Sequence, residues 1–244
     1  MRHMSKRFRL GSPMISVSKL QFTYRDSPFS LQIPELNLAG GQSAVIVGPS
    51  GSGKTTLLHL MAGILSATGG EIIVGDTSVH KLNDVDRRLF RLLNIGLVFQ
   101  DFQLIDYLKV LENVLLPCRL TPSISLTEDL RARAIALLTS AGIQSLQNRS
   151  VTRLSQGERQ RVAICRALLL SPKLVLADEP TGNLDPATTQ RIVQLLLQET
   201  SRSNASLVMV THDHSLLPSF DRVIPFEPFV YGTHSAQSPS GVDS

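Results

Sequence analysis

Residues 43–56 read SAVIVGPSGSGKTT, a short apolar run that leads straight into a glycine-rich loop. The pattern G-x-x-x-x-G-K-T lets consecutive backbone N–H groups turn toward a phosphate, and the helix expected to follow points its positive end at the same anion. We expect Lys54 to reach the β- and γ-phosphates of a nucleotide and the Thr55 hydroxyl to ligate Mg²⁺. The alternative is a glycine turn without a ligand, which the preceding strand and following helix disfavour. The expected nucleotide-binding residues here are Gly48, Pro49, Ser50, Gly51, Ser52, Gly53, Lys54, Thr55 and Thr56.

Two carboxylates end a second apolar run, LVLADE at residues 174–179. At the end of a buried strand, Asp178 is expected to hold Mg²⁺, and Glu179 to polarise an attacking water. The alternative is a pair of carboxylates that only cap a helix. The glycine-rich loop upstream favours the catalytic interpretation.

The composition is that of a globular protein: of 244 residues, 42% are hydrophobic and 18% charged, with a net charge of +4. Four basic residues lie in the first nine positions, so the remainder is close to neutral and offers no basic face for nucleic acid. No apolar run approaches the ~18 residues that span a bilayer. Cys118 and Cys165 lie far apart, which favours a reducing compartment over a disulfide or a metal site.

Periodicity predicts an α/β fold with a mostly parallel sheet, an N-terminal antiparallel β region and an inserted helical subdomain at about residues 101–170. We expect residues 1–13 to be a disordered basic leader, 14–231 to be the folded domain, and the polar tail 232–244 to be disordered. Strands are predicted at 15–22, 30–38, 43–47, 71–74, 95–99, 175–177 and 207–210, and helices at 55–64, 111–116, 126–141, 156–170 and 186–200.

The stretch LSQGERQRVAICRAL at residues 154–168 resembles the signature segment of the ATP-binding cassette (ABC) ATPases, and the resemblance extends over residues 14–226. It implies a P-loop NTPase core. It also implies that Ser155 and Gly157 face the γ-phosphate bound by a second copy of the chain. The sequence departs from the usual LSGGQ at Gln156 and Glu158. Gln156 is the larger departure, because Gly tolerates positive φ and Gln does not readily do so.

Further family elements follow in the family's order. Gln100 resembles the Q-loop glutamine, which contacts Mg²⁺ or the attacking water. Residues 183–185 resemble the D-loop, in which Asp185 reaches across the dimer. His212 resembles the switch histidine at the γ-phosphate, and Tyr24 the aromatic residue that stacks on adenine. Alone, such a histidine is usually polar surface and such a tyrosine usually core, so their value lies in their joint order.

The resemblance implies a Mg²⁺-dependent ATPase that works as a homodimer with ATP sandwiched between two copies. It further implies a separate integral membrane permease that holds the chain at the cytoplasmic face of the inner membrane. Residues 95–117 and 177–185 resemble the branch of lipoprotein-releasing and macrolide-export ATPases. The alternatives are an ABC ATPase that acts on DNA or ribosomes, or a weakly hydrolysing regulatory subunit. We expect no nucleic-acid partner.

Residues 101–117, which follow Gln100, are rich in apolar side chains for an expected loop. We therefore predict that the membrane subunit docks on this segment. The alternative is that these side chains pack the join between the two subdomains. The side chains concerned are Phe102, Leu104, Ile105, Tyr107 and Leu108.

Overall fold

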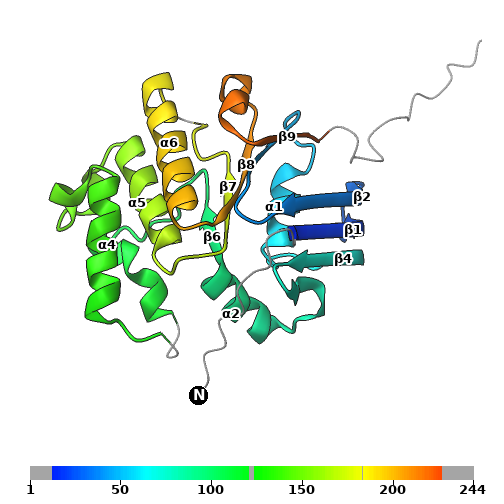
Figure 1. Cartoon of the computed structure of the whole chain (residues 1–244), viewed down its shortest axis with the longest axis horizontal. Helices are drawn as coiled ribbons and strands as arrows, with labels where there is room; N and C mark the ends of the chain where they lie inside the picture. The colour runs from blue at the N-terminus through cyan, green and yellow to red at the C-terminus, as the bar shows by residue number, and fades with distance from the viewer. Residues whose placement is uncertain (1–12, 121–123, 183, 227–244) are drawn as a thin grey trace, which may run out of the picture.

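Two β-sheets and two groups of helices form the fold, seen in the computed structural model that describes residues 13–120, 124–182 and 184–226 (Figure 1). A five-stranded sheet has the order β6-β7-β8-β3-β9, and a four-stranded sheet the order β2-β1-β4-β5. The predicted leader, apart from its last residue, and the predicted polar tail lie outside the described residues.

Every neighbouring pair of strands in the five-stranded sheet is parallel. The three central strands are buried on both faces because successive side chains point to opposite sides. In β8, Leu207 and Met209 enter one hydrophobic cluster, whereas Val208 and Val210 enter the other. The strands are β3 (Ser43–Val47), β6 (Ile95–Val98), β7 (Leu174–Asp178), β8 (Ser206–Thr211) and β9 (Arg222–Pro225).

The four-stranded sheet is antiparallel throughout and confirms the predicted N-terminal β region. Its inner face packs against α1 (Lys54–Met61), which lies between the two sheets (Figure 1). Its strands are β1 (Pro13–Thr23), β2 (Ser30–Ala39), β4 (Gly69–Val74) and β5 (Thr77–Ser78).

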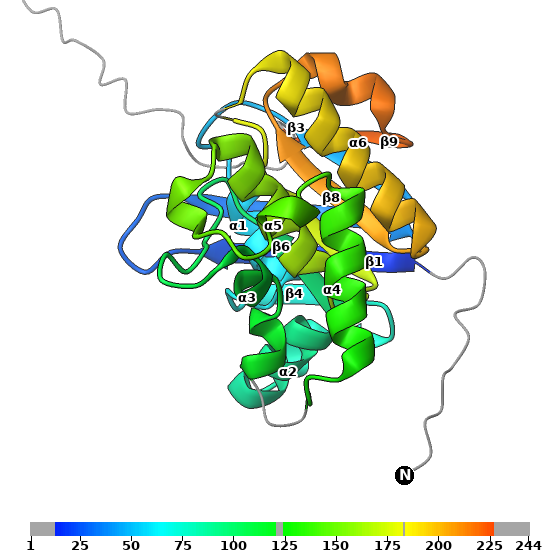
Figure 2. The same ribbon diagram turned by 90° about the vertical axis from the view of Figure 1, so that its left-hand side faces the viewer.

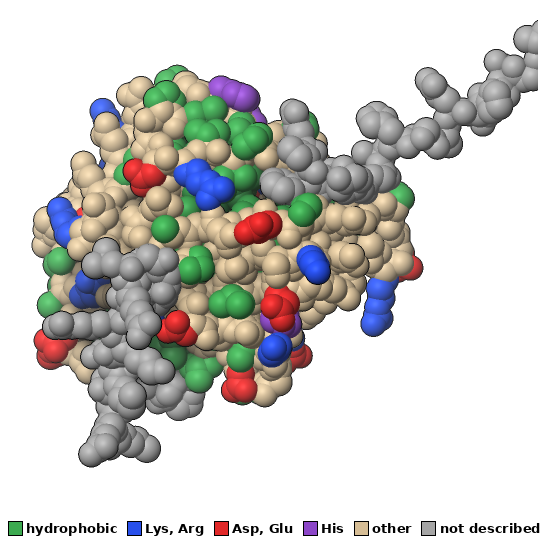
Figure 3. Space-filling model, turned by 45° about the vertical axis from the view of Figure 1, so that its right-hand side comes forward, with side chains coloured by type: hydrophobic (Ala, Val, Ile, Leu, Met, Phe, Trp, Pro, Cys, Tyr) green, Lys and Arg blue, Asp and Glu red, His purple; other side chains and the backbone are tan. Residues whose placement is uncertain are grey.

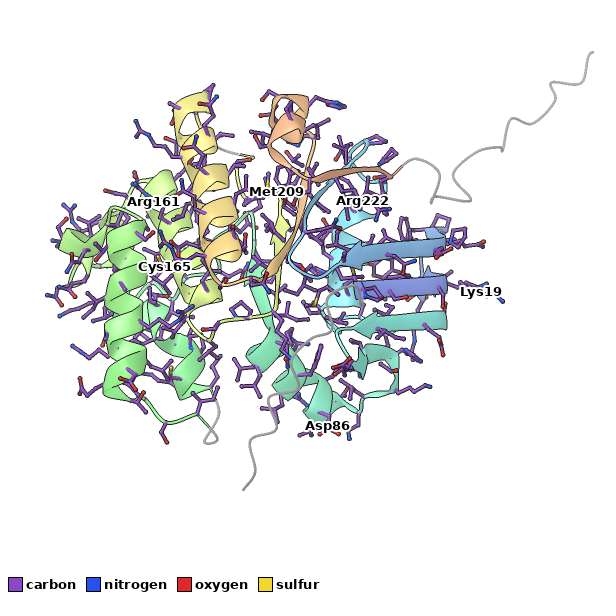
Figure 4. The ribbon with its side chains drawn as sticks, viewed as in Figure 1. Lys19, Asp86, Arg161, Cys165, Met209 and Arg222 are labelled. Carbon is purple, nitrogen blue, oxygen red and sulfur yellow. The ribbon has the colours of Figure 1, made fainter. Side chains whose placement is uncertain are left out.

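The other face of the parallel sheet carries most of the helices, which lie side by side in Figure 2. They share one hydrophobic cluster with the sheet, and Figure 4 shows two of its members, Cys165 on a helix and Met209 on β8. The helical block is therefore packed directly on the sheet, and its boundaries at 101 and 170 stay a prediction. The helices are α3 (Val110–Val114), α4 (Glu128–Ser140), α5 (Gln156–Leu168) and α6 (Pro186–Arg202).

Helix α1 ends three residues before the predicted position. Gly63 adopts φ 63°, a left-handed conformation that ends the helix, and the amide of Ile64 donates to the carbonyl of His59 at 2.8 Å. The predicted apolar spacing to Ile64 was therefore right about the buried face and wrong about the helix end.

Helix α2 (Asp84–Asn94) was not predicted, and none of its residues is buried. Its start is capped by Asn83, whose side chain accepts from the amides of Val85 and Asp86. Within the described ranges, no helix combines the length and the apolar character needed to cross a bilayer.

Candidate nucleotide site

The phosphate loop, residues 48–56, runs from the end of β3 into the first turn of α1. Gly51 and Gly53 have φ of 75° and 99°, backbone conformations that residues with a Cβ rarely adopt. The Lys54 ammonium donates to the carbonyls of Gly48 at 2.9 Å and Pro49 at 2.7 Å, inside the curve of the loop. Burial lowers the pKa of Lys54, and the carboxylates of Glu179 and Asp178 oppose that shift. The buried Ser52 hydroxyl has no hydrogen-bond partner among the described residues.

The acidic pair lies directly opposite this loop. The Thr55 hydroxyl donates to a carboxylate oxygen of Asp178 at 3.1 Å. Burial raises the pKa of Asp178. A cation bound beside this carboxylate would oppose that shift, because it favours the charged form. A hydroxyl and a carboxylate are hard oxygen donors of the kind that Mg²⁺ accepts. Among the described residues, no group of three or more His, Cys, Asp or Glu side chains is arranged to hold a metal ion.

Glu179 follows at the carboxyl end of β7 with an unusual backbone. Its φ is 43°, left-handed for a residue with a side chain, and its amide donates to the carbonyl of Val210 on β8 at 3.1 Å. One oxygen of its carboxylate lies 3.1 Å from Nδ1 of His212. The structure thus brings together two residues that sequence reasoning assigned separately, Glu179 from the acidic pair and His212 from the family resemblance.

One pocket of about 410 Å³ collects most of the predicted residues. Glu179 also lines an adjoining pocket of about 470 Å³, together with His212. The first pocket is lined by Tyr24, Phe29, Ser50, Gly51, Gly53, Lys54, Thr55, Thr56, Gln100, Asp178 and Glu179.

Two aromatic rings stand at the mouth of this pocket. Tyr24 is 41% exposed, and its hydroxyl lies 3.1 Å from that of Thr56. Phe29, which sequence reasoning missed, packs against Tyr24 with ring centroids 5.8 Å apart. A Cβ built on Gly53 would lie 2.5 Å from the Phe29 ring, so this ring covers the phosphate loop. Phe29 is in the connection between β1 and β2, and no pattern in the sequence marks it.

The signature segment is well ordered by its own contacts. Ser155 caps α5, and the Ser155 amide and hydroxyl both donate to the Glu158 carboxylate, at 2.8 and 3.0 Å. The amide of Ser155 is the largest cause of a lowered pKa at Glu158. Gln156 begins the helix, is exposed, and has no positive φ, so the expected conflict with its backbone is absent. A Cβ on Gly157 would lie 2.7 Å from Cγ2 of Thr188.

Seven predicted residues are absent from the lining of the first pocket: Gly48, Pro49 and Ser52 belong to the phosphate loop itself, and His212 lines the adjoining pocket. The other three, Ser155, Gly157 and Asp185, line neither pocket. Asp185 instead caps α6 by accepting from the amide of Thr188 at 3.0 Å. Asn183, the first residue of the predicted D-loop, lies outside the described residues.

Comparison with known proteins gives a consistent result. The sequence profile of the ABC transporter family matches residues 31–182. The chain is 38% identical over 214 residues to the lipoprotein-releasing system ATP-binding protein LolD of Legionella pneumophila (strain Lens), covering 86% of this chain and 93% of that protein. It is 39% identical over 217 residues to the uncharacterized ABC transporter ATP-binding protein Rv0986 of Mycobacterium tuberculosis, covering 87% of this chain and 86% of that protein.

Solved structures agree with the fold. A dimeric structure of MJ0796, a bacterial ABC transporter cassette, is 35% identical with a TM-score of 0.77, covering 87% of this chain and 94% of that one. A dimeric post-hydrolysis state of MJ0796 bound to ADP and phosphate gives 0.76 at 34% identity, covering the same shares of both chains. The predicted P-loop NTPase core is thereby confirmed. The chain belongs to the ABC transporter family, as an ATP-binding and ATP-hydrolysing subunit.

Proposed function

We propose that two copies of this chain close on two Mg-ATP molecules and that this closure drives a membrane transporter formed by separate subunits. The observation that carries the proposal is the separation of Ser155 and Gly157 from the pocket that contains Lys54 and Glu179. A signature segment that lines neither pocket of its own chain could contact a nucleotide held by a second chain. The dimeric relatives support this arrangement.

Within each site we propose distinct roles for the side chains. Lys54 neutralises the β- and γ-phosphates, Tyr24 stacks on the adenine, and Gln100 contacts the attacking water. Glu179 takes the proton of that water, and His212 holds the Glu179 carboxylate and contacts the γ-phosphate. Mg²⁺, held by Thr55 and Asp178, would supply charge neutralisation on the phosphates.

We further propose a partner of the lipoprotein-releasing type, with the ATPase peripheral at the cytoplasmic face of the inner membrane. The LolD relatives support this branch. The face in Figure 3 carries basic and acidic side chains interspersed, with no broad basic field for DNA or ribosomal RNA. The paired Glu179 and His212 count against a regulatory subunit without hydrolysis.

The proposed docking surface is a groove of about 680 Å³ between α2, β6, the short helix Leu116–Arg119 and α5. It overlaps the segment predicted from sequence at Gln103 and at residues 116–117. Its lining is mainly apolar and includes Arg88, Arg91 and Arg166, none of which forms an ion pair with a described carboxylate. We propose that a helix of the membrane subunit lies here, with an apolar face and at least one carboxylate for these arginines.

Two apolar side chains of the segment predicted to dock, Leu104 and Tyr107, differ in the structure. Leu104 packs against the hydrophobic cluster beneath it, as the alternative interpretation expected. Tyr107 is 87% exposed and is available to a partner. Of these two residues, only Tyr107 can therefore be replaced to test docking without disturbing the packed core.

Dimerisation is tested with Glu179→Gln, which keeps the phosphate contacts and removes the proton acceptor. This variant should elute as a dimer with Mg-ATP, and as a monomer with ADP or without nucleotide, because ADP lacks the γ-phosphate that the signature contacts. A monomer at saturating Mg-ATP, in both this variant and Glu179→Gln/Gln156→Gly, would contradict the proposed dimer. A dimer only after the Gly replacement would identify Gln156 as the obstacle.

Docking is tested with Tyr107→Asp and Arg88→Glu in liposomes that contain a membrane subunit of the lipoprotein-releasing type. We expect loss of partner-stimulated hydrolysis, while Arg88→Lys and the exposed control Leu126→Asp retain it. Hydrolysis by the isolated ATPase is measured in parallel. Equal losses in both assays would mean that these side chains serve the fold and not the partner.

A further inference from the structure

The turn after Gln100 has an unfavourable backbone at two consecutive residues. Phe102 and Gln103 have φ of 58° and 50°, a left-handed conformation that residues with a Cβ rarely adopt, and rarely twice in succession. Such a turn persists only when its surroundings hold it. The contacts that hold it are therefore informative.

Helix α5 holds this turn through main-chain carbonyls. The Arg166 guanidinium donates to the carbonyl of Phe102 at 2.7 Å and also to that of Gln103. On the other side of Gln100, the fully buried Gln160 donates to the carbonyl of Phe99 at 3.5 Å. Burial lowers the pKa of Arg166, which forms no ion pair with a described carboxylate. Its planar fork suits two neighbouring carbonyls, as one ammonium would not.

The same helix begins at the proposed dimer contact. Ser155 caps α5, which continues without a break to Leu168. A rise of ~1.5 Å per residue separates Ser155 from Arg166 by roughly 16 Å along the axis. Displacement of the signature end therefore moves Arg166 as part of one rigid element.

The turn lies between two functional regions. Gln100 lines the nucleotide pocket, where a Cβ on Gly182 would lie 3.1 Å from its Nε2. Gln103 and Arg166 line the groove proposed for the membrane subunit. A shift of the turn would thus change both the nucleotide pocket and the groove proposed for the membrane subunit.

We propose that Arg166 is a positioning residue that couples the signature segment to the turn at residues 101–103. Contact between Ser155 and a nucleotide in the other copy moves α5, and Arg166 carries the motion to Gln100 and to the groove. This inference rests on the proposed dimer, so dimer formation is measured separately. Arg166 acts through the carbonyls of Phe102 and Gln103 and does not itself contact the nucleotide in this proposal.

The chain contains no tryptophan, which allows a single reporter. Tyr107, exposed and close to the turn in sequence, is replaced in the double variant Tyr107→Trp/Glu179→Gln. We expect Mg-ATP, but not Mg-ADP, to change its emission and its quenching by acrylamide. Adding Arg166→Met should abolish that change while the protein still elutes as a dimer.

Arg161→Met is the matched control, because Arg161 lies on the same helix but donates to the carbonyl of Ala141 (Figure 4). It should retain the ATP-dependent change. If Arg166→Met does not fold, Arg166→Lys gives the same test, since it keeps the charge and loses the fork. The coupling alone is overturned if Tyr107→Trp/Glu179→Gln dimerises without a change in fluorescence. It is also overturned if the Arg166 variant keeps that change. If Tyr107→Trp/Glu179→Gln stays monomeric with Mg-ATP, the proposed dimer is overturned, and so is the coupling that rests on it.

Discussion

The phosphate loop and the signature segment are both ordered, but in opposite ways. The loop turns its groups inward, and Lys54, Thr55 and Asp178 meet in one pocket. The signature segment closes its hydrogen bonds on itself, through Ser155 and Glu158, and stays apart from that pocket. The nucleotide pocket thus forms within one chain, whereas the signature segment is ordered without contacting that pocket, and its role rests on the proposed dimer.

The largest expected effect is a loss of ATP turnover in the pocket that contains the phosphate loop. Glu179→Gln should lower ATP turnover by ~10²–10⁴-fold, the usual contribution of a general base, while ATP affinity is retained. The measurement is phosphate release alongside nucleotide binding. Hydrolysis by the unmodified chain should rise steeply with protein concentration, because each site needs two chains. Turnover unchanged by the substitution would remove Glu179 from its assigned role.

The next effect concerns nucleotide binding at the mouth of the loop pocket. Tyr24→Ala should weaken ATP binding by about 5- to 150-fold, because base–aromatic stacking contributes roughly 1–3 kcal/mol. Tyr24→Phe keeps the ring and loses the contact with Thr56, so it should stay within a few-fold of the unmodified chain. Equal binding by the Ala variant and the unmodified chain would place adenine elsewhere.

The signature side is tested through packing. Gly157→Ala should destabilise the fold by about 1–3 kcal/mol, because its Cβ would overlap Cγ2 of Thr188. Thr188→Ser removes that methyl group and should restore most of the loss in a double-mutant cycle. Thermal unfolding gives the values. Additive effects of the two substitutions would show that the overlap is relieved by movement elsewhere.

The smallest effect is a dependence of stability on pH. The folded-state pKa of Glu158 is lowered, so its stabilisation is present above its ordinary pKa of ~4.3 and is lost as the pH falls through the lowered value. The melting temperature of Glu158→Gln should therefore differ most from that of the unmodified chain near neutral pH, and the difference should shrink under acid conditions. A difference that is constant with pH would mean that the cap does not depend on charge.

The parts of the fold that sequence predicted are those with a buried periodic face. The strands at 43–47 and 207–210 are continuous apolar runs, and both lie inside the parallel sheet. Helix α2 was missed although its sequence is amphipathic and Asn83 caps its start. Its Leu89 and Leu92 line the groove, whereas Phe90 packs against the core. The left-handed Gly63 ended α1 early, which a hydrophobic pattern does not register.

The candidate site divides in the same way. Lys54, Thr55, Asp178 and Glu179 follow from spacing because a loop and a strand end fix them locally. Phe29 did not follow, because only pairing of β1 with β2 brings it against Gly53.

The alternation along the parallel strands has a consequence for how the sequence can change. Neighbours in β8 such as Val208 and Met209 belong to separate hydrophobic clusters on opposite faces of the sheet. Replacements at these two positions have different packing partners, so their costs should combine almost independently. The side that carries the signature helix can therefore drift in composition without compensating changes around the phosphate loop.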